Sequence, residues 1–339
     1  MKKIVYIGNN LSGLNNYATS LDFLSKLLRK NNFDVIIASN KQNKYLRLID
    51  MCVTVFKNRK GTGCILIDTF STTNFYFALI VSQLARLFHI KYIPILRGGN
   101  LPQRLSENRR FSNLIFTNSF INIAPSFYLK AAFDLKKIPT HFIPNGINLE
   151  LYKYKKRKSI QPKLLWVRAF DSIYNPFMAI HVVAGLKEPY PNVKLCMVGP
   201  DKDGSLELCK KLSKELNVIE NIEFTGVLPK EKWIAKANNF DVFLNTTSID
   251  NMPISVMEAM ALGLPVISTN AGGMKYLIKD DNTGILVARN DSKAMQASVI
   301  KLIENSDKAI EIANNARLYI EKFDVNKVEQ KWLKILNNV

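Results

Sequence analysis

Short apolar runs alternate along this chain with longer segments in which apolar residues recur every three to four positions. The short runs predict strands, and the longer segments predict amphipathic helices. Regular alternation of the two predicts parallel βαβ units. In the first half we predict strands at residues 4–7, 33–38, 64–68, 92–96, 121–125 and 141–143, and helices near residues 13–30, 43–56, 74–88 and 127–133.

The same alternation resumes after a polar, basic interval at residues 148–162, whose composition is typical of a linker. The predicted strands of this second half are residues 164–167, 193–199, 222–225, 242–245, 265–269 and 284–287, and the last helices are near 292–305, 308–322 and 325–335. The fold class is therefore α/β, with two Rossmann-like, doubly wound lobes at residues 1–150 and 164–322, a basic linker at 151–163 and a C-terminal helix at 323–339. Such sheets bind ligands beyond the carboxyl ends of their strands, so a site in a cleft between the lobes is expected.

The net charge of +19 is distributed unevenly along the 339 residues. Residues 1–150 contain 20 Lys/Arg and 7 Asp/Glu, residues 151–163 contain 6 and none, and residues 164–339 contain 21 of each. Because the whole excess lies in the first half and the linker, we expect an anionic partner there. Anionic lipid headgroups and a diphosphate-linked lipid acceptor suit this excess. The alternative is a basic surface that is simply solvated.

Composition disfavours several other classes of protein and site. The most apolar longer stretch, residues 75–88, contains Ser82, Gln83 and Arg86 and is too short for a transmembrane helix. The apolar run near the start spans four residues, too few for a signal peptide. The four cysteines and three histidines lack metal-ligand or disulfide spacing, so we expect no metal and no cofactor in a cytoplasmic protein. The 34 aromatic residues do not cluster with Lys/Arg, so no nucleic-acid partner is expected.

The segment from Asp250 to Gly273 combines a polar turn, an apolar helix and a strand. Pro253 is predicted as the first helical residue, with Asp250 and Asn251 as capping residues. Within this helix Glu258 needs polar partners, and two sugar hydroxyls would suit its two acceptor oxygens. The N–H groups at the helix start suit a diphosphate. Asp250 precedes Glu258 by eight residues, about 12 Å at helical rise, roughly the length of a nucleotide-sugar.

This segment resembles the E-x7-E signature of the family 4 glycosyltransferases, which have the two-lobed GT-B fold. The similarity continues through Glu258-Ala-Met-Ala-Leu-Gly-Leu-Pro-Val and Gly272-Gly273, and Ile143-Pro-Asn-Gly-Ile-Asn148 is a second family-like marker. Asp250 stands where the family has its first Glu. The resemblance implies that Glu258 binds the ribose and Asp250 the transferred sugar. Donor binding by the intervening turn would use Asn251, Met252, Pro253 and Ile254.

The resemblance also implies roles at the ends of neighbouring strands. Arg168 matches the family arginine that clamps the donor diphosphate. The family lysine that usually follows is absent, and this chain has Tyr174-Asn175-Pro176 in its place. Asn175 and the N–H groups of a helix that begins there are expected to make the phosphate contacts instead. Gly199 ends the next strand, and the backbone at Val227 is expected to contact the nucleobase. Asp201 and Asp203 have the spacing of a metal motif, but the lobe topology argues against that role.

Two loops of the first half are predicted to face the same ligand. Ser12 and Gly13 lie after the first strand, where family members often have two glycines facing the diphosphate and the acceptor. Arg97 stands where related sequences often have His, and it is followed by Gly98, Gly99 and Asn100. An arginine cannot act as a base at neutral pH, so Arg97 would stabilise negative charge. The alternative is a turn with a surface arginine.

The resemblance implies a retaining, metal-independent hexosyltransferase acting in bacterial surface polysaccharide biosynthesis. A UDP-sugar is the expected donor, with a GDP-sugar second, and the expected acceptor is a saccharide or lipid-linked saccharide. The protein is then expected to be peripheral at the inner face of the cell membrane. A nucleotide-sugar 2-epimerase or a phosphorylase could share the two-lobed frame, and a non-catalytic nucleic-acid- or saccharide-binding protein remains a further alternative.

Overall fold

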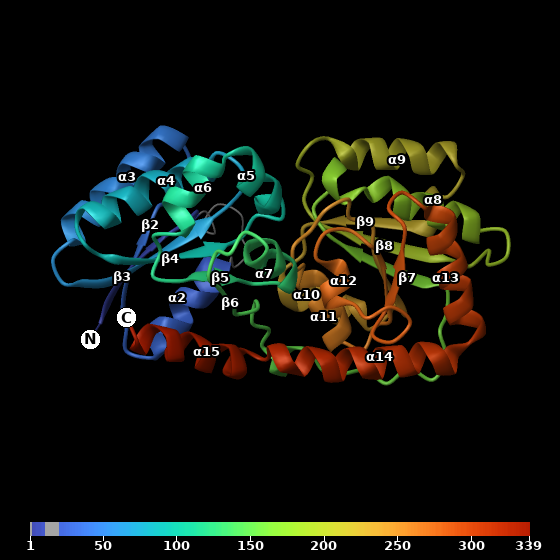
Figure 1. Ribbon diagram of the computed structural model, residues 1–339. Coiled ribbons are helices and arrows are strands. Elements are labelled where there is room, and N and C mark those ends of the chain that lie inside the picture. Colours follow the sequence, from blue (N-terminus) through green and yellow to red (C-terminus); the bar gives the residue numbers. More distant parts are fainter. Residues whose placement is uncertain (1, 11–19) are drawn as a thin grey trace. The chain divides into compact units, whose positions relative to one another are not determined.

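The computed structural model describes residues 2–10 and 20–339. The chain divides into two compact units, Met1–Asn145 with Asn326–Val339, and Gly146–Val325. Each unit is built on a six-stranded parallel sheet with helices on both faces (Figure 1). This confirms the predicted fold class of two doubly wound α/β lobes.

The sheet of the first unit has the strand order β2-β1-β3-β4-β5-β6. Its strands are β1 (Lys3–Ile7), β2 (Asp34–Ala38), β3 (Thr62–Thr69), β4 (Lys91–Leu96), β5 (Asn122–Ala124) and β6 (Thr140–Phe142). Its helices are α2 (Ser20–Lys30), α3 (Lys44–Asn58), α4 (Asn74–Leu87), α5 (Leu101–Glu107), α6 (Arg109–Phe116), α7 (Phe127–Asp134) and most of α15 (Val325–Asn337). The short helices α5 and α6 are absent from the predicted elements. Each has eight residues or fewer, too few for a clear helical period.

The final helix packs against the first unit. Lys2 Nζ donates to the Leu336 carbonyl at 3.3 Å, and Asn31 Nδ2 donates to Glu329 Oε1 at 2.7 Å. Trp332 is buried on the inner side of the helix. The contacts of this helix therefore join the end of the chain to its beginning.

The sheet of the second unit has the order β12-β11-β10-β7-β8-β9, so its strand order reverses between β7 and β10. Its strands are β7 (Lys163–Val167), β8 (Lys194–Val198), β9 (Ile222–Gly226), β10 (Val242–Asn245), β11 (Val266–Thr269) and β12 (Ile285–Val287). Its helices are α8 (Pro176–Leu186), α9 (Ser205–Glu215), α10 (Lys230–Ala237), α11 (Ile254–Ala261), α12 (Met274–Leu277), α13 (Ser292–Glu304) and α14 (Ser306–Ile320). Apart from the edge strand β9, in which only Ile222 is buried, the strands are mostly buried, as expected for a parallel sheet covered on both faces.

Residues 151–163, predicted as a basic linker, are packed onto the second unit. Arg157 Nε donates to Asp241 Oδ1 at 3.1 Å, and Arg157 Nη1 donates to the Gly263 carbonyl at 2.6 Å. Tyr152 and Ile160 are buried. Composition does not reveal these contacts, because the inward-facing residues are interleaved with exposed lysines.

None of the helices in the described part of the chain is both long and apolar enough to span a bilayer. This agrees with the sequence, which has no apolar run of that length.

Candidate active site

The candidate site lies at the reversal of strand order in the second unit. Arg168 directly follows β7, and Asp250 lies in the loop after the neighbouring strand β10. Arg168 Nη2 and Asp250 Oδ2 form a hydrogen-bonded ion pair. Ligands of open α/β sheets bind in the crevice at such a switch point, so strand order places the two predicted charges where a ligand is expected.

The Arg168 guanidinium is held over the ring of Tyr174 at 4.2 Å. The Tyr174 carbonyl accepts from Thr246 Oγ1 at 2.8 Å, and Thr246 Oγ1 accepts from Trp166 Nε1 at 2.9 Å. The loop after β7 is thereby tied to the loop after β10. Tyr174 therefore positions the Arg168 guanidinium. In the sequence, Tyr174 stands out only because the segment that contains it replaces the family lysine.

Two buried polar atoms at this site have no hydrogen-bond partner. They are Arg168 Nε and Ser255 Oγ in the first turn of α11, two of the three such side-chain atoms in residues 2–10 and 20–339. Buried polar atoms are normally satisfied, so these two point to a ligand. The first turn of a helix also presents unsatisfied N–H groups. Together these donors suit an anionic, oxygen-rich ligand such as a diphosphate.

The turn at Asp250 and Asn251 rests on the glycine pair that precedes α12. The Asp250 carbonyl accepts from Gly273 N at 2.8 Å, and Asp250 Oδ1 accepts from Asn251 N at 2.8 Å. A Cβ atom at Gly272 would lie 2.2 Å from the Asp250 carbonyl oxygen, and one at Gly273 would lie 1.7 Å from that of Asn251. Only glycines permit this approach, which fixes the position of Asp250.

Asp250 and Asn251 do not cap α11, so that expectation is wrong. Pro253 occupies the N-cap position without a side-chain hydrogen bond, and the helix begins at Ile254. The Asp250 carboxylate is instead taken up by Arg168 and by its own turn. Met252 and Pro253 are buried, and Ile254 is 37% exposed at the start of the helix.

Glu258 is buried on α11, and one of its oxygens takes part in a hydrogen bond and an ion pair. Its Oε1 accepts from Tyr152 Oη at 2.6 Å and pairs with Lys230 Nζ at 2.7 Å. Burial and the Glu258 carboxylate both raise the pKa of the Tyr152 hydroxyl, which therefore stays protonated and donates. No described residue donates to Oε2, so this oxygen remains available to ligand hydroxyls. Tyr152 and Lys230 were missed because neither lies in a motif.

Replacing Glu258 with alanine is expected to raise the Kd for UDP about 10- to 100-fold, because hydrogen bonds to a charged group contribute about 1.5–3 kcal/mol. Tyr152→Phe should have a smaller effect, since it removes only a bond that positions the carboxylate. Isothermal titration calorimetry measures both. Glu329→Ala removes a buried glutamate of the first unit and is the matched control. Equal UDP affinity in Glu258→Ala and the control would contradict the ribose assignment.

Gly199 allows β8 to end close to Arg168. Its N–H donates to the Gly226 carbonyl at 2.9 Å, and a Cβ atom at this position would lie 1.7 Å from the Arg168 carbonyl oxygen. Val227, which follows β9, is 47% exposed.

Helix α8 begins at Pro176, as predicted, but Asn175 Nδ2 donates to Asn290 Oδ1 at 2.9 Å. The expected phosphate contact of Asn175 would therefore use other atoms of this loop.

The Arg97 side chain is only 11% exposed in the first unit, so the surface-arginine alternative is wrong. Its Nε donates to Asp68 Oδ1 at 2.9 Å, Nη1 to Asn145 Oδ1 at 3.1 Å and Nη2 to Tyr6 Oη at 3.2 Å. Burial opposes its charge, but Asp68 and Tyr6 on balance raise the pKa of Arg97. All three nitrogens are engaged, and the geometry makes Arg97 the centre of a buried polar network. In the sequence, the position of Asp68 near the end of the β3 strand is the one feature that could have identified it as a partner of Arg97.

Gly98, which follows Arg97, also permits a close approach. A Cβ atom at Gly98 would lie 2.6 Å from Ser71 N, and Gly99 and Asn100 lead into α5. Ser12 and Gly13 lie outside the described residues. Their predicted role at the diphosphate and acceptor therefore stays a prediction.

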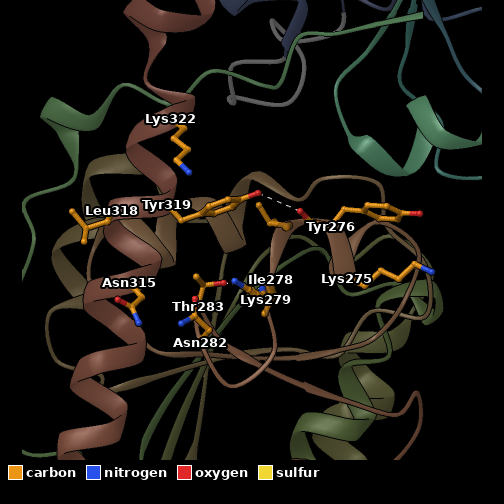
Figure 2. A pocket seen from close by; sticks show the side chains of 11 residues that line it. Lys275, Tyr276, Ile278, Lys279, Asn282, Thr283, Asn315, Leu318, Tyr319 and Lys322 are labelled. Atoms are coloured by element: carbon orange, nitrogen blue, oxygen red, sulfur yellow. Dashed lines mark hydrogen bonds between the residues drawn. The ribbon is translucent and has the colours of Figure 1, made fainter. Parts of the chain in front are cut away.

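A separate cavity of about 540 Å³ lies between α12 and α14, where Tyr319 Oη donates to the Tyr276 carbonyl at 3.3 Å (Figure 2). Its lysines, Lys275, Lys279 and Lys322, are exposed. It contains none of the predicted donor-binding residues, so its volume alone does not make it the active site. Within the described ranges, no group of three or more His, Cys, Asp or Glu is placed to hold a metal ion.

Residues 151–319 match the family described as Glycosyl transferases group 1. With the fold and the site geometry, this match shows that the chain belongs to the group 1 glycosyltransferases of the GT-B fold. HepE of Anabaena, solved in complex with UDP and glucose, superimposes with a TM-score of 0.78 over 100% of both chains at 17% identity. At that identity the likeness shows the fold.

Two curated relatives match parts of the chain. Trehalose synthase of Thermococcus litoralis is 31% identical over 206 residues, covering 56% of this chain and 48% of that protein. The putative colanic acid biosynthesis glycosyltransferase WcaL of Escherichia coli is 29% identical over 119 residues, covering 33% and 29%. The chain thus spans half or less of the length of these relatives.

Proposed function

We propose that this protein transfers a sugar from a nucleotide-sugar, with a UDP-sugar as the first choice, to an acceptor hydroxyl with retention of configuration. The ion pair of Arg168 and Asp250 at the switch point of the second sheet carries the proposal. Glu258 supports it, since an acceptor-only carboxylate oxygen on the neighbouring helix suits ribose hydroxyls. The complex of HepE with UDP-glucose supports the choice of donor by analogy of fold.

In the proposed reaction, the bond between the anomeric carbon and the diphosphate oxygen breaks, and the acceptor oxygen bonds to the same face of that carbon. The acceptor proton leaves to the departing diphosphate or to water. Arg168 and the N-terminus of α11 stabilise the negative charge that develops on the diphosphate, usually the largest catalytic contribution. These fixed charges are the basis for proposing a reaction without a metal.

The proposed acceptor is a saccharide or lipid-linked saccharide at the inner face of a bacterial membrane, in surface polysaccharide biosynthesis. The first unit contains 23 Lys/Arg and 7 Asp/Glu, whereas the second contains 24 and 21. Basic residues near an anionic bilayer contribute about 1 kcal/mol each. The charge of the first unit therefore supports a membrane-bound substrate, as does the similarity to WcaL.

Incubation with a panel of nucleotide-sugars tests this function directly. We expect slow release of UDP from one UDP-sugar in the absence of acceptor, and faster release when a suitable saccharide is added. NMR of the product should show the anomeric configuration of the donor. A donor converted to its epimer without transfer would indicate the 2-epimerase instead. Binding of oligonucleotides in preference to every nucleotide-sugar would indicate a non-catalytic nucleic-acid-binding protein.

A further inference from the structure

Helix α3 of the first unit presents apolar side chains to solvent as well as to the core. Its buried residues Arg47, Met51 and Val55 face the sheet. Five large apolar residues, here named the α3 face, are 40–80% exposed: Tyr45, Leu46, Ile49, Val53 and Phe56. At about 100° per residue these five fall within an arc of about 100°, opposite the buried side. A helix that covers a sheet normally has a polar outer side, so this face needs a partner.

Basic residues surround the α3 face. Residues 41–60 contain six Lys/Arg and one Asp/Glu. The exposed lysines Lys41, Lys44, Lys57 and Lys60 flank the helix at both ends, and none of them forms an ion pair with a described residue. Arg59 lies over the ring of Phe56 at 4.1 Å. An apolar arc flanked by unpaired cations is complementary to an anionic bilayer, which offers hydrocarbon beneath negative headgroups.

We propose that the α3 face inserts into the interfacial region of an anionic lipid bilayer, with the flanking lysines among the headgroups. The proposal rests on the proposed function in that a lipid-linked acceptor requires the enzyme at the membrane. A second copy of the chain suits the face less well. Pairing two α3 faces would bring two basic surfaces together with only Asp50 of each segment to offset them.

Apolar insertion and electrostatic attraction differ in their dependence on salt. Salt screens the attraction between lysines and headgroups, whereas apolar burial persists. The intact chain is therefore expected to cosediment with vesicles of phosphatidylglycerol and phosphatidylcholine at low salt, and to keep part of this binding at high salt. Binding that salt abolishes completely would overturn insertion.

Glutamine substitutions test the face itself. The triple variant Leu46→Gln, Ile49→Gln, Phe56→Gln is expected to lower the vesicle partition coefficient about tenfold or more, because inserted apolar area is lost. The matched control Leu135→Gln, Leu208→Gln, Leu318→Gln replaces three exposed leucines elsewhere and should bind like the wild type. Equal binding by the two variants would overturn the proposal. The proposal would also be overturned if the wild type were a dimer and only the α3 variant converted it to a monomer.

A tryptophan reporter gives direct evidence of insertion. The native residues Trp166, Trp233 and Trp332 are buried. In Tyr45→Trp, anionic vesicles are expected to shift the emission to shorter wavelength, whereas Leu135→Trp should show no shift. If the Tyr45→Trp protein sedimented with the vesicles but its tryptophan emission did not shift, insertion would be contradicted.

UDP-sugar hydrolysis without vesicles separates this proposal from the proposed function. The α3 variants should hydrolyse donor as the wild type does, since the face lies outside the donor site. Vesicle binding without any hydrolysis by the wild type would refute the proposed function and leave the membrane contact standing. Hydrolysis without vesicle binding would refute the membrane contact alone.

Discussion

Replacing Arg168 with alanine is expected to lower kcat/KM for sugar transfer about 100- to 1,000-fold, the usual effect of removing one donor that stabilises developing negative charge. The guanidinium pairs with Asp250 through Nη2 and presents a buried Nε without a partner. No other residue type is always charged and donates in several directions at once. Steady-state release of UDP from the best donor of the panel measures the effect.

Two further variants make the Arg168 prediction specific. Arg168→Lys keeps the charge but loses the fork of donors, so it should restore only part of the activity. Arg157→Lys alters a buried arginine that pairs with Asp241 in the same unit. It should lower the melting temperature while kcat/KM per folded molecule stays unchanged. Full activity in Arg168→Ala would rule out its proposed role at the diphosphate.

Replacing Gly273 with alanine is expected to disable the site although this residue need not touch the substrate. The new Cβ would lie 1.7 Å from the Asn251 carbonyl oxygen, so the turn that carries Asp250 must move. A displacement of about 1 Å can lower kcat about 100-fold, and overpacking of this kind costs about 1–3 kcal/mol of stability. Activity per folded molecule and the melting temperature should be measured together.

Gly63→Ala is the matched control for Gly273→Ala. A Cβ atom at Gly63 would make only an ordinary contact, 3.7 Å from the Lys3 carbonyl oxygen. This variant should leave activity and melting temperature close to those of the wild type. If Gly273→Ala retained full kcat with a lowered melting temperature, the glycine pair would serve stability without positioning Asp250.

Local pattern was sufficient to predict the strands and most of the helices. Parallel strands buried on both faces are apolar runs bounded by polar turns, so β1, β4, β7 and β10 were each predicted to within one residue. The errors arose where local pattern is weak. Helices α5 and α6, which were not predicted, have only seven and eight residues.

Each residue predicted for the donor site was chosen because it stands at a strand end or in a family-like motif. Their partners were not predicted. Tyr152 reaches Glu258 across 106 residues, and Arg168 reaches Asp250 across 82. Arg97 could be read as a surface or a ligand-facing charge until Asp68 and Tyr6 were found beside it.

The sequence by itself determined the two α/β lobes, the uneven charge and the residue types available at the strand ends, because each of these is a property of neighbours along the chain. Only the tertiary structure decided that β10 lies beside β7, which brings Asp250 to Arg168. It also decided which apolar side of α3 is left uncovered. The physical reason is that strand order and helix burial depend on contacts between segments far apart in sequence, which no local pattern specifies.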